Sequence, residues 1–239
     1  MESRMARFEQ YLNETAEPDL ALLMGCIRVY QATGNVRFRD YAAERARVGM
    51  PLLFALDVTG EESIRQAAME QAGRELNVQR LEEAFALLPF RMGYEMKLNR
   101  MAWVSRVAEQ FKGLRTRLYD EEAGLYCASA GEGFTPVSTG WYLAALADSI
   151  EACDQQLYEH WRALVDILRE CLRGLLRFGN TAGAESLTLY AIRKAVRMGI
   201  IDPERYLPVA EKMETTMDES AGMGAYMMAW AEIQMADGR

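Results

Sequence analysis

The fold is decided by a stretch that reads LALLMGCIRVYQATGN from Leu20 to Asn35 and continues as VRFRDYAAE from Val36 to Glu44. The first part is apolar on most of its surface, which is typical of a helix that is covered on several sides. The second part has the mixed apolar and charged pattern of an amphipathic helix. Gly34 stands where the end of a helix often takes a left-handed residue. The stretch therefore predicts a hairpin of one buried and one half-exposed helix.

The same unit recurs along the whole chain. Further apolar helices are predicted at Met50–Gly60, Ala84–Asn99, Gly140–Ile150, Ser186–Gly199 and Gly224–Ile233. Each of these except the last is followed by a more amphipathic helix, and the N-terminal segment Glu2–Asn13 can supply the sixth partner. Such units bury their apolar faces by stacking on one another. The units vary in length, whereas the repeats of an open solenoid, which is the alternative, keep a fixed period. We therefore expect an all-α fold, the (α/α)6 barrel or six-hairpin toroid, as a single domain over residues 1–239.

The composition excludes several classes of function. With 27 basic and 35 acidic residues the formal net charge is −8, which disfavours binding to nucleic acid or to an anionic membrane surface. No stretch of about 18 apolar residues suggests a membrane span. The first residues resemble an amphipathic helix rather than a signal peptide, so a cytoplasmic location is expected.

The cysteines and the one histidine give no sign of a metal site. Cys26, Cys127, Cys153 and Cys171 show no close pairing, and three of them lie in apolar helical segments where Cys acts as a small hydrophobe. We expect reduced thiols. His160 lies in a predicted outer helix, and zinc requires several His or Cys ligands. Neither a metal nor a cofactor is expected.

One long segment does not read as helix. Tyr119–Pro136 is rich in Gly and other turn-forming residues, and a short strand is predicted around Leu125-Tyr-Cys127. Because this segment precedes an apolar helix, we expect it to lie over the mouth of the ring.

Several stretches resemble the unsaturated uronyl hydrolases of glycoside hydrolase families 88 and 105, and the resemblance runs nearly end to end. They are Tyr30–Tyr41, Pro89–Glu95, Leu118–Tyr126, Gly140–Glu151, Glu159–Leu164, Ala191–Gly199 and Gly222–Glu232. The resemblance implies the (α/α)6 toroid. It also implies an activity in which a carboxyl group protonates a terminal unsaturated uronic sugar and water adds beside it, after which the sugar leaves the chain.

The resemblance breaks where the chemistry is expected. The family's aspartic acid, seven residues before the Pro-Phe pair, corresponds to Glu82. An arginine of the family that suits a uronate carboxylate corresponds to Val137, although Gly140 and Trp141 of that motif are kept. Most of the family's long substrate-binding loops are absent.

Acidic residues gather where the apolar helices begin. We predict Glu82 and Glu83 as catalytic residues, because convergent carboxylates in different environments can act as acid and base. Substrate-binding residues are predicted at four further positions: Trp141, Glu185, Asp19 and Glu219. The alternative for the acids is structural, since the helix macrodipole and free N–H groups favour acids at helix N-termini.

Two functions follow from these patterns. The first is a reduced hydrolase that acts on a small unsaturated uronide or a related sugar. The second is a non-catalytic toroid that binds a small ligand or a protein, because a fold does not fix a function. A filled ring centre would favour the second function.

Overall fold

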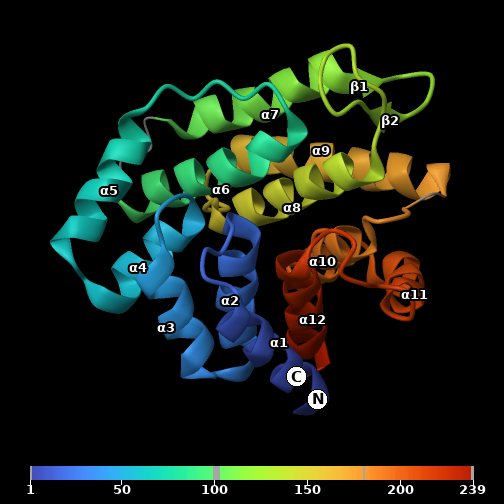
Figure 1. The fold of residues 1–239 in the computed structure, drawn as a ribbon. Coiled ribbons are helices and arrows are strands. Elements are labelled where there is room, and N and C mark those ends of the chain that lie inside the picture. The colour runs from blue at the N-terminus through green and yellow to red at the C-terminus, as the bar shows by residue number, and fades with distance from the viewer. Residues whose placement is uncertain (1, 99–102, 180, 238–239) are drawn as a thin grey trace.

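The computed structural model describes residues 2–98, 103–179 and 181–237, and helices make up most of this part of the chain (Figure 1). The inner helices are α2 (Leu20–Thr33), α4 (Met50–Thr59), α6 (Leu81–Lys97), α8 (Pro136–Ala152), α10 (Glu185–Arg197) and α12 (Met223–Asp237). The outer helices are α1 (Glu2–Glu14), α3 (Val36–Arg45), α5 (Glu62–Gly73), α7 (Val104–Leu118), α9 (Tyr158–Phe178) and α11 (Pro203–Glu214). The predicted all-α architecture is confirmed.

The six inner helices form a closed ring. Each contacts the next in the order α2, α4, α6, α8, α10, α12, and α12 contacts α2 in turn. An open solenoid would leave its first and last units apart, so the toroid is the correct prediction. The N-terminal helix α1 covers α12, where Phe8 meets the ring of Trp230 edge to face at 5.4 Å. The two chain ends consequently lie close together (Figure 1).

Local sequence signals set most helix ends. Gly34 and Gly60 follow α2 and α4 with φ of 71° and 68°, which is the left-handed conformation predicted at Gly34. Asp202 caps α11 by accepting a hydrogen bond from the backbone N–H of Glu204. The predicted end of the third apolar helix, Asn99, lies outside the described residues, and α7 begins at Val104.

Two inner helices begin about one turn earlier than the apolar pattern predicts. Helix α6 starts at Leu81, and α8 starts at Pro136 rather than within the Gly140 stretch. The cause at α8 is local, because the Thr135 hydroxyl accepts a hydrogen bond from Ser138 N and Pro136 occupies a first-turn position that needs no N–H donor. Because of this extra turn, Ser138 belongs to the first turn of α8, whereas the apolar pattern predicts a helix only from Gly140.

The segment between α7 and α8 forms a small hairpin of β1 (Tyr119–Asp120) and β2 (Leu125–Tyr126), with Tyr119 opposite Tyr126. The short strand predicted around Leu125 is confirmed. After β2 the chain runs to the beginning of α6, where Leu81 N donates to the carbonyl oxygen of Ala128 at 3.3 Å. This segment therefore lies at the end of the ring where α6 begins.

The four cysteines are free thiols, and Cys26, Cys153 and Cys171 are buried. Burial raises the pKa of Cys26 to about 12 and that of Cys153 to about 11, so both remain protonated and behave as small hydrophobes. Within the described ranges, no group of three or more His, Cys, Asp or Glu residues is arranged to hold a metal ion. No helix in the same ranges combines the length and apolarity that crossing a bilayer requires.

Closure of the ring depends on a close approach of α2 and α12. A Cβ atom added to Gly224 in α12 would lie 2.2 Å from the carbonyl carbon of Ala21 and 2.3 Å from its oxygen. The obstacle is backbone rather than a flexible side chain, so the two helices would have to move apart.

We predict that Gly224→Ala lowers the free energy of unfolding by about 1–3 kcal/mol, the usual cost of overpacking. Gly73→Ala is the matched control, because Gly73 ends α5 and an added Cβ there meets nothing within 4 Å. This control should leave stability unchanged or slightly raised. Urea unfolding of both variants is the measurement, and equal effects would contradict the close contact.

Candidate active site

The N-terminal ends of the inner helices gather at one end of the ring. A Cβ on Gly49, directly before α4, would lie 3.0 Å from the Leu20 side chain in α2 and 3.4 Å from the carbonyl oxygen of Ala86 in α6. Gly224 in the first turn of α12 touches Ala21 in the first turn of α2. The starts of α2, α4, α6 and α12 are therefore neighbours.

The remaining contacts complete this end, which we call the mouth. Phe85 of α6 and Trp141 of α8 lie with ring centroids 4.9 Å apart. A Cβ on Gly183, just before α10, would lie 3.5 Å from Val137 of α8 and 4.0 Å from Ser220, just before α12. All six inner helices thus begin around the mouth, where the predicted site residues stand.

Glu82 is held by the first turn of α8. The Ser138 hydroxyl donates a hydrogen bond to Oε1 of Glu82, and the Thr135 hydroxyl donates to the Ser138 oxygen at 2.6 Å. Oε2 of Glu82 lies 3.8 Å from Nε of Arg80, whose other guanidinium nitrogens bind both carboxylate oxygens of Glu132 at 2.8 and 3.2 Å. The Glu82 side chain is 40% exposed. Ser138 thus fixes one carboxylate oxygen, whereas Oε2 is buried and accepts no hydrogen bond from the described residues.

Glu83 and Asp19 have structural partners. Oε2 of Glu83 accepts hydrogen bonds from the backbone N–H groups of Gln79 and Arg80, at 2.9 and 3.3 Å, directly before α6. Oδ1 of Asp19 accepts from Leu22 N at 2.7 Å and caps α2. Both carboxylates satisfy free N–H groups at helix starts, as the structural alternative in the sequence analysis describes.

Glu219 and Glu185 lie on the α10 and α12 side of the mouth. Glu219, in the loop before α12, forms an ion pair with Arg7 of α1 at 2.6 Å. Glu185 is the first residue of α10 and is half-buried. Trp141 is also half-buried and packs on Phe85. Of the six predicted residues, the structure brings Glu82 and Trp141 into one local group, through Ser138 and Phe85.

A second set of charged residues lies inside the ring and was missed by the sequence analysis. Asp148 of α8 accepts hydrogen bonds from Arg28 of α2, at 2.9 Å, and from Tyr190 and Lys194 of α10. All four side chains are buried, and Lys194 has no exposed surface. Helices α2 and α8 stand opposite each other in the ring, so this contact spans the interior and fills it.

This network reaches solvent at Glu151. Its carboxylate pairs with Arg28 at 2.9 Å, Lys194 at 2.6 Å and Arg197 at 2.8 Å, and 31% of the side chain is exposed. Arg197 also binds both carboxylate oxygens of buried Glu232 in α12. These residues lie in the later turns of their helices, away from the mouth. Three cations and three carboxylates balance one another, so we interpret the network as structural.

The pKa of Glu151 reflects these neighbours. Burial opposes ionisation of the carboxyl, but Lys194 and Arg28 outweigh burial and hold the pKa well below its usual 4.5. A carboxyl whose pKa is lower in the folded than in the unfolded protein stabilises the fold above the unfolded pKa. That stabilisation is lost as the pH falls below about 4.5 toward the folded value.

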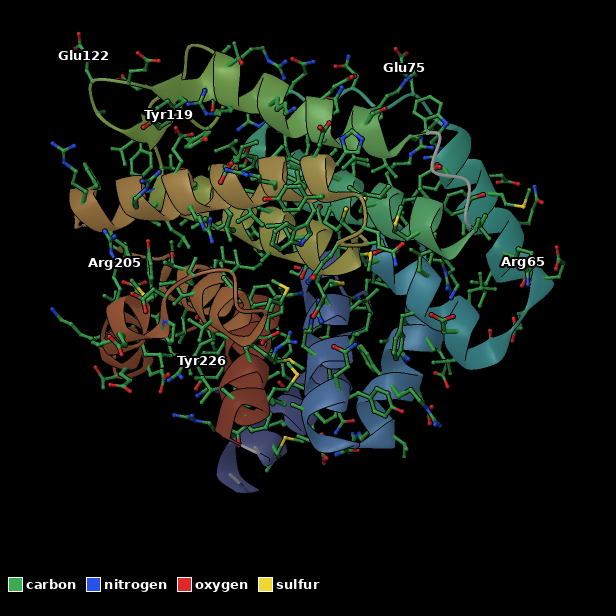
Figure 2. All side chains as sticks on the ribbon, turned by 180° about the vertical axis from the view of Figure 1, so that it is seen from behind. Arg65, Glu75, Tyr119, Glu122, Arg205 and Tyr226 are labelled. Carbon is green, nitrogen blue, oxygen red and sulfur yellow. The ribbon has the colours of Figure 1, made fainter. Side chains whose placement is uncertain are left out.

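We predict that Glu151→Gln lowers the free energy of unfolding at pH 7. The free energy of unfolding of this variant should also fall less than that of the unaltered protein as the pH drops below 5. Glu122→Gln is the matched control, since Glu122 extends into solvent at the turn of the β1–β2 hairpin (Figure 2). Chemical unfolding across this pH range is the measurement. A Glu151→Gln profile parallel to that of the unaltered protein would contradict the pairing.

No family model matches the sequence, and no curated protein matches it either. Solved structures do match in fold. A polysaccharide lyase superposes with a TM-score of 0.76 at 15% identity, over 91% of this chain and 90% of the lyase. A family 105 glycoside hydrolase from C. acetobutylicum ATCC 824 gives 0.76 at 16% identity, over 90% and 92%. A family 88 glycosyl hydrolase from Bacteroides vulgatus gives 0.72 at 12% identity, over 90% and 91%. At such low identities the chain shares the toroid fold with these enzymes, and the likeness extends over nearly their full length.

Proposed function

We propose that this chain is a carbohydrate-processing enzyme of the unsaturated uronyl hydrolase type, with Glu82 as its acid and base. The observation that carries the proposal is the placement of Glu82 at the mouth, hydrogen-bonded to Ser138 and one helix turn before the Phe85–Trp141 pair. A carboxyl beside an aromatic surface is a common arrangement for sugar chemistry. The fold shared with two glycoside hydrolases and a polysaccharide lyase supports it.

The reaction needs one carboxyl that gives and then regains a proton. Glu82 in its acid form donates a proton to C4 of the unsaturated sugar, and the oxygen of a water molecule adds to C5. The proton released by that water returns to Glu82, and the hydrated sugar then opens and releases the next residue of the chain. The Ser138 hydrogen bond orients the Glu82 carboxyl for both transfers.

Recognition of a uronate carboxylate should be weak. Val137 stands in the first turn of α8, where the resemblance implies an arginine. Arg80 is near Glu82 but is already bound by Glu132. We therefore expect a high KM for uronides, because the mouth offers no uncommitted guanidinium fork among these residues.

A second function is favoured by the filled interior. Arg28 and Asp148 meet across the ring, so a ligand at the mouth cannot extend deep along the ring axis. A shallow mouth suits binding of a sugar end without catalysis. In that case Trp141 would contribute affinity, and Glu82 would act as a hydrogen-bond acceptor for sugar hydroxyl groups.

An unsaturated galacturonyl disaccharide distinguishes the two functions. At high enzyme concentration we predict loss of the ultraviolet absorbance of its conjugated double bond, and Glu82→Gln should reduce the rate about 100-fold or more. Glu75→Gln is the control of equal charge change, because Glu75 is exposed between α5 and α6 (Figure 2). Absence of any bleaching by the unaltered protein would contradict hydrolysis, and sugar binding measured by Trp fluorescence would then support the second function.

A further inference from the structure

An open groove of about 600 Å³ lies on the outside of the ring, between the outer helices α7, α9 and α11. Four arginines line it: Arg115, Arg169, Arg173 and Arg205. Its three acidic residues are Asp166, Glu170 and Asp202. None of these residues belongs to the mouth. The concentration of guanidinium groups stands out in a chain whose net charge is −8.

Two of the three acids accept hydrogen bonds from the protein. Glu170 accepts two hydrogen bonds from Arg115, at 2.6 and 2.7 Å, and a third from the Tyr126 hydroxyl at 3.0 Å. Asp202 caps α11 through the backbone N–H of Glu204 at 3.0 Å. Arg115 and Glu170 therefore form a neutral, rigid wall of the groove.

The third acid sits between two arginines at the rim. Asp166 lies 3.7 Å from Nε of Arg162 and 3.9 Å from Nη1 of Arg169. Arg169 itself donates through Nε and Nη2 to the carbonyl oxygen of Ile200, which anchors its guanidinium to the loop after α10. Glu170 and Asp166 thus lie beside arginines of the protein, and Asp202 accepts from a backbone N–H group.

Arg173 and Arg205 are the two lining arginines not yet accounted for. Both are exposed, and among the described residues no carboxylate lies within the 4.0 Å of an ion pair from either of them. Nε of Arg173 donates to the carbonyl oxygen of Arg169 at 3.2 Å, which leaves its two terminal nitrogens toward the groove. The Arg205 guanidinium lies 5.4 Å from the ring centroid of buried Tyr206, and Figure 2 shows Arg205 where α11 faces α9.

We propose that this groove binds a small anion that carries two carboxylate or phosphate groups, one on Arg173 and one on Arg205. A planar guanidinium fork matches either group through two parallel hydrogen bonds. Arg115 is anchored by Glu170 and Arg169 by the carbonyl oxygen of Ile200, so both form fixed walls of the groove. The guanidinium groups of Arg173 and Arg205 line the same groove from α9 and α11. The proposal is independent of catalysis at the mouth.

Calorimetric titration at low salt tests the proposal with two probes, digalacturonate and inorganic pyrophosphate. We expect one of them to bind at a single site, and which one binds tells whether the groove takes carboxylates or phosphates. Arg173→Ala and Arg205→Ala should each weaken that binding about 10-fold or more. Arg177→Ala is the matched control, because Arg177 is exposed one turn further along α9 but does not line the groove.

Thermal unfolding verifies that each of the three variants is folded. We expect little loss of stability, because these exposed side chains form no ion pair with another described residue. Binding of neither probe would overturn the proposal. Equal loss of affinity in all three variants would also overturn it, because the attraction would then be a general effect of charge. Binding of digalacturonate that survives Arg173→Ala and Arg205→Ala but is lost in Glu82→Gln would place the ligand at the mouth and reject the groove.

Discussion

Asp148 accepts hydrogen bonds from two buried cations, Arg28 and Lys194, and these contacts join helices that are far apart in the chain. A buried carboxylate without partners would destabilise the fold by several kcal/mol, and so would either cation. The three groups are therefore compatible with burial only when α2, α8 and α10 pack in one register. Burial also raises the pKa of Tyr190, which keeps its hydroxyl neutral and able to donate to Asp148. Packing of apolar surface drives the ring to form, and this network restricts which arrangement of helices is stable.

The network also makes the two ends of the ring different. It fills the interior toward the later turns of the inner helices, where Glu151, Arg197 and Glu232 continue it. The opposite end holds Glu82, Ser138 and the Phe85–Trp141 pair, and it is bordered by the segment that leaves the β1–β2 hairpin. A ligand in the ring is thereby limited to the mouth. The structure stabilises one end through matched charges, and at the other end it leaves Oε2 of Glu82 without a hydrogen-bond partner among the described residues.

Much of the fold could be predicted from the sequence because its determinants are local. Apolar helices, the left-handed glycines Gly34 and Gly60, and the Asp202 cap act within a few residues of one another. The start of α8 was placed too late, since the signal there is Thr135-Pro136 rather than an apolar pattern. The candidate site was less predictable. Acidic residues at helix starts cannot be told apart by sequence. In the structure Glu83 and Asp19 accept hydrogen bonds from backbone N–H groups, whereas Glu82 accepts one from the Ser138 hydroxyl.

The sequence contains signs of the buried charges inside the ring, but it does not show which of them pair. Asp148 and Glu151, and likewise Tyr190, Lys194 and Arg197, recur at helical spacing inside otherwise apolar helices. That spacing indicates charges on one buried face. Their partner Arg28 lies 120 residues from Asp148, and only the closed ring brings the two together. The same holds for the groove between α9 and α11, whose arginines come from three different outer helices.

The coupling energy between Arg28 and Asp148 tests the closed ring most directly. A double-mutant cycle with Arg28→Met, Asp148→Asn and the double variant, followed by urea unfolding, isolates the interaction across the ring. The account predicts that each single change destabilises the protein strongly, and that the double variant is more stable than additivity requires by at least about 1 kcal/mol. Additive effects, within about 0.5 kcal/mol, would mean that the two side chains do not interact. That result would contradict the claim that the buried network fixes the arrangement of the inner helices.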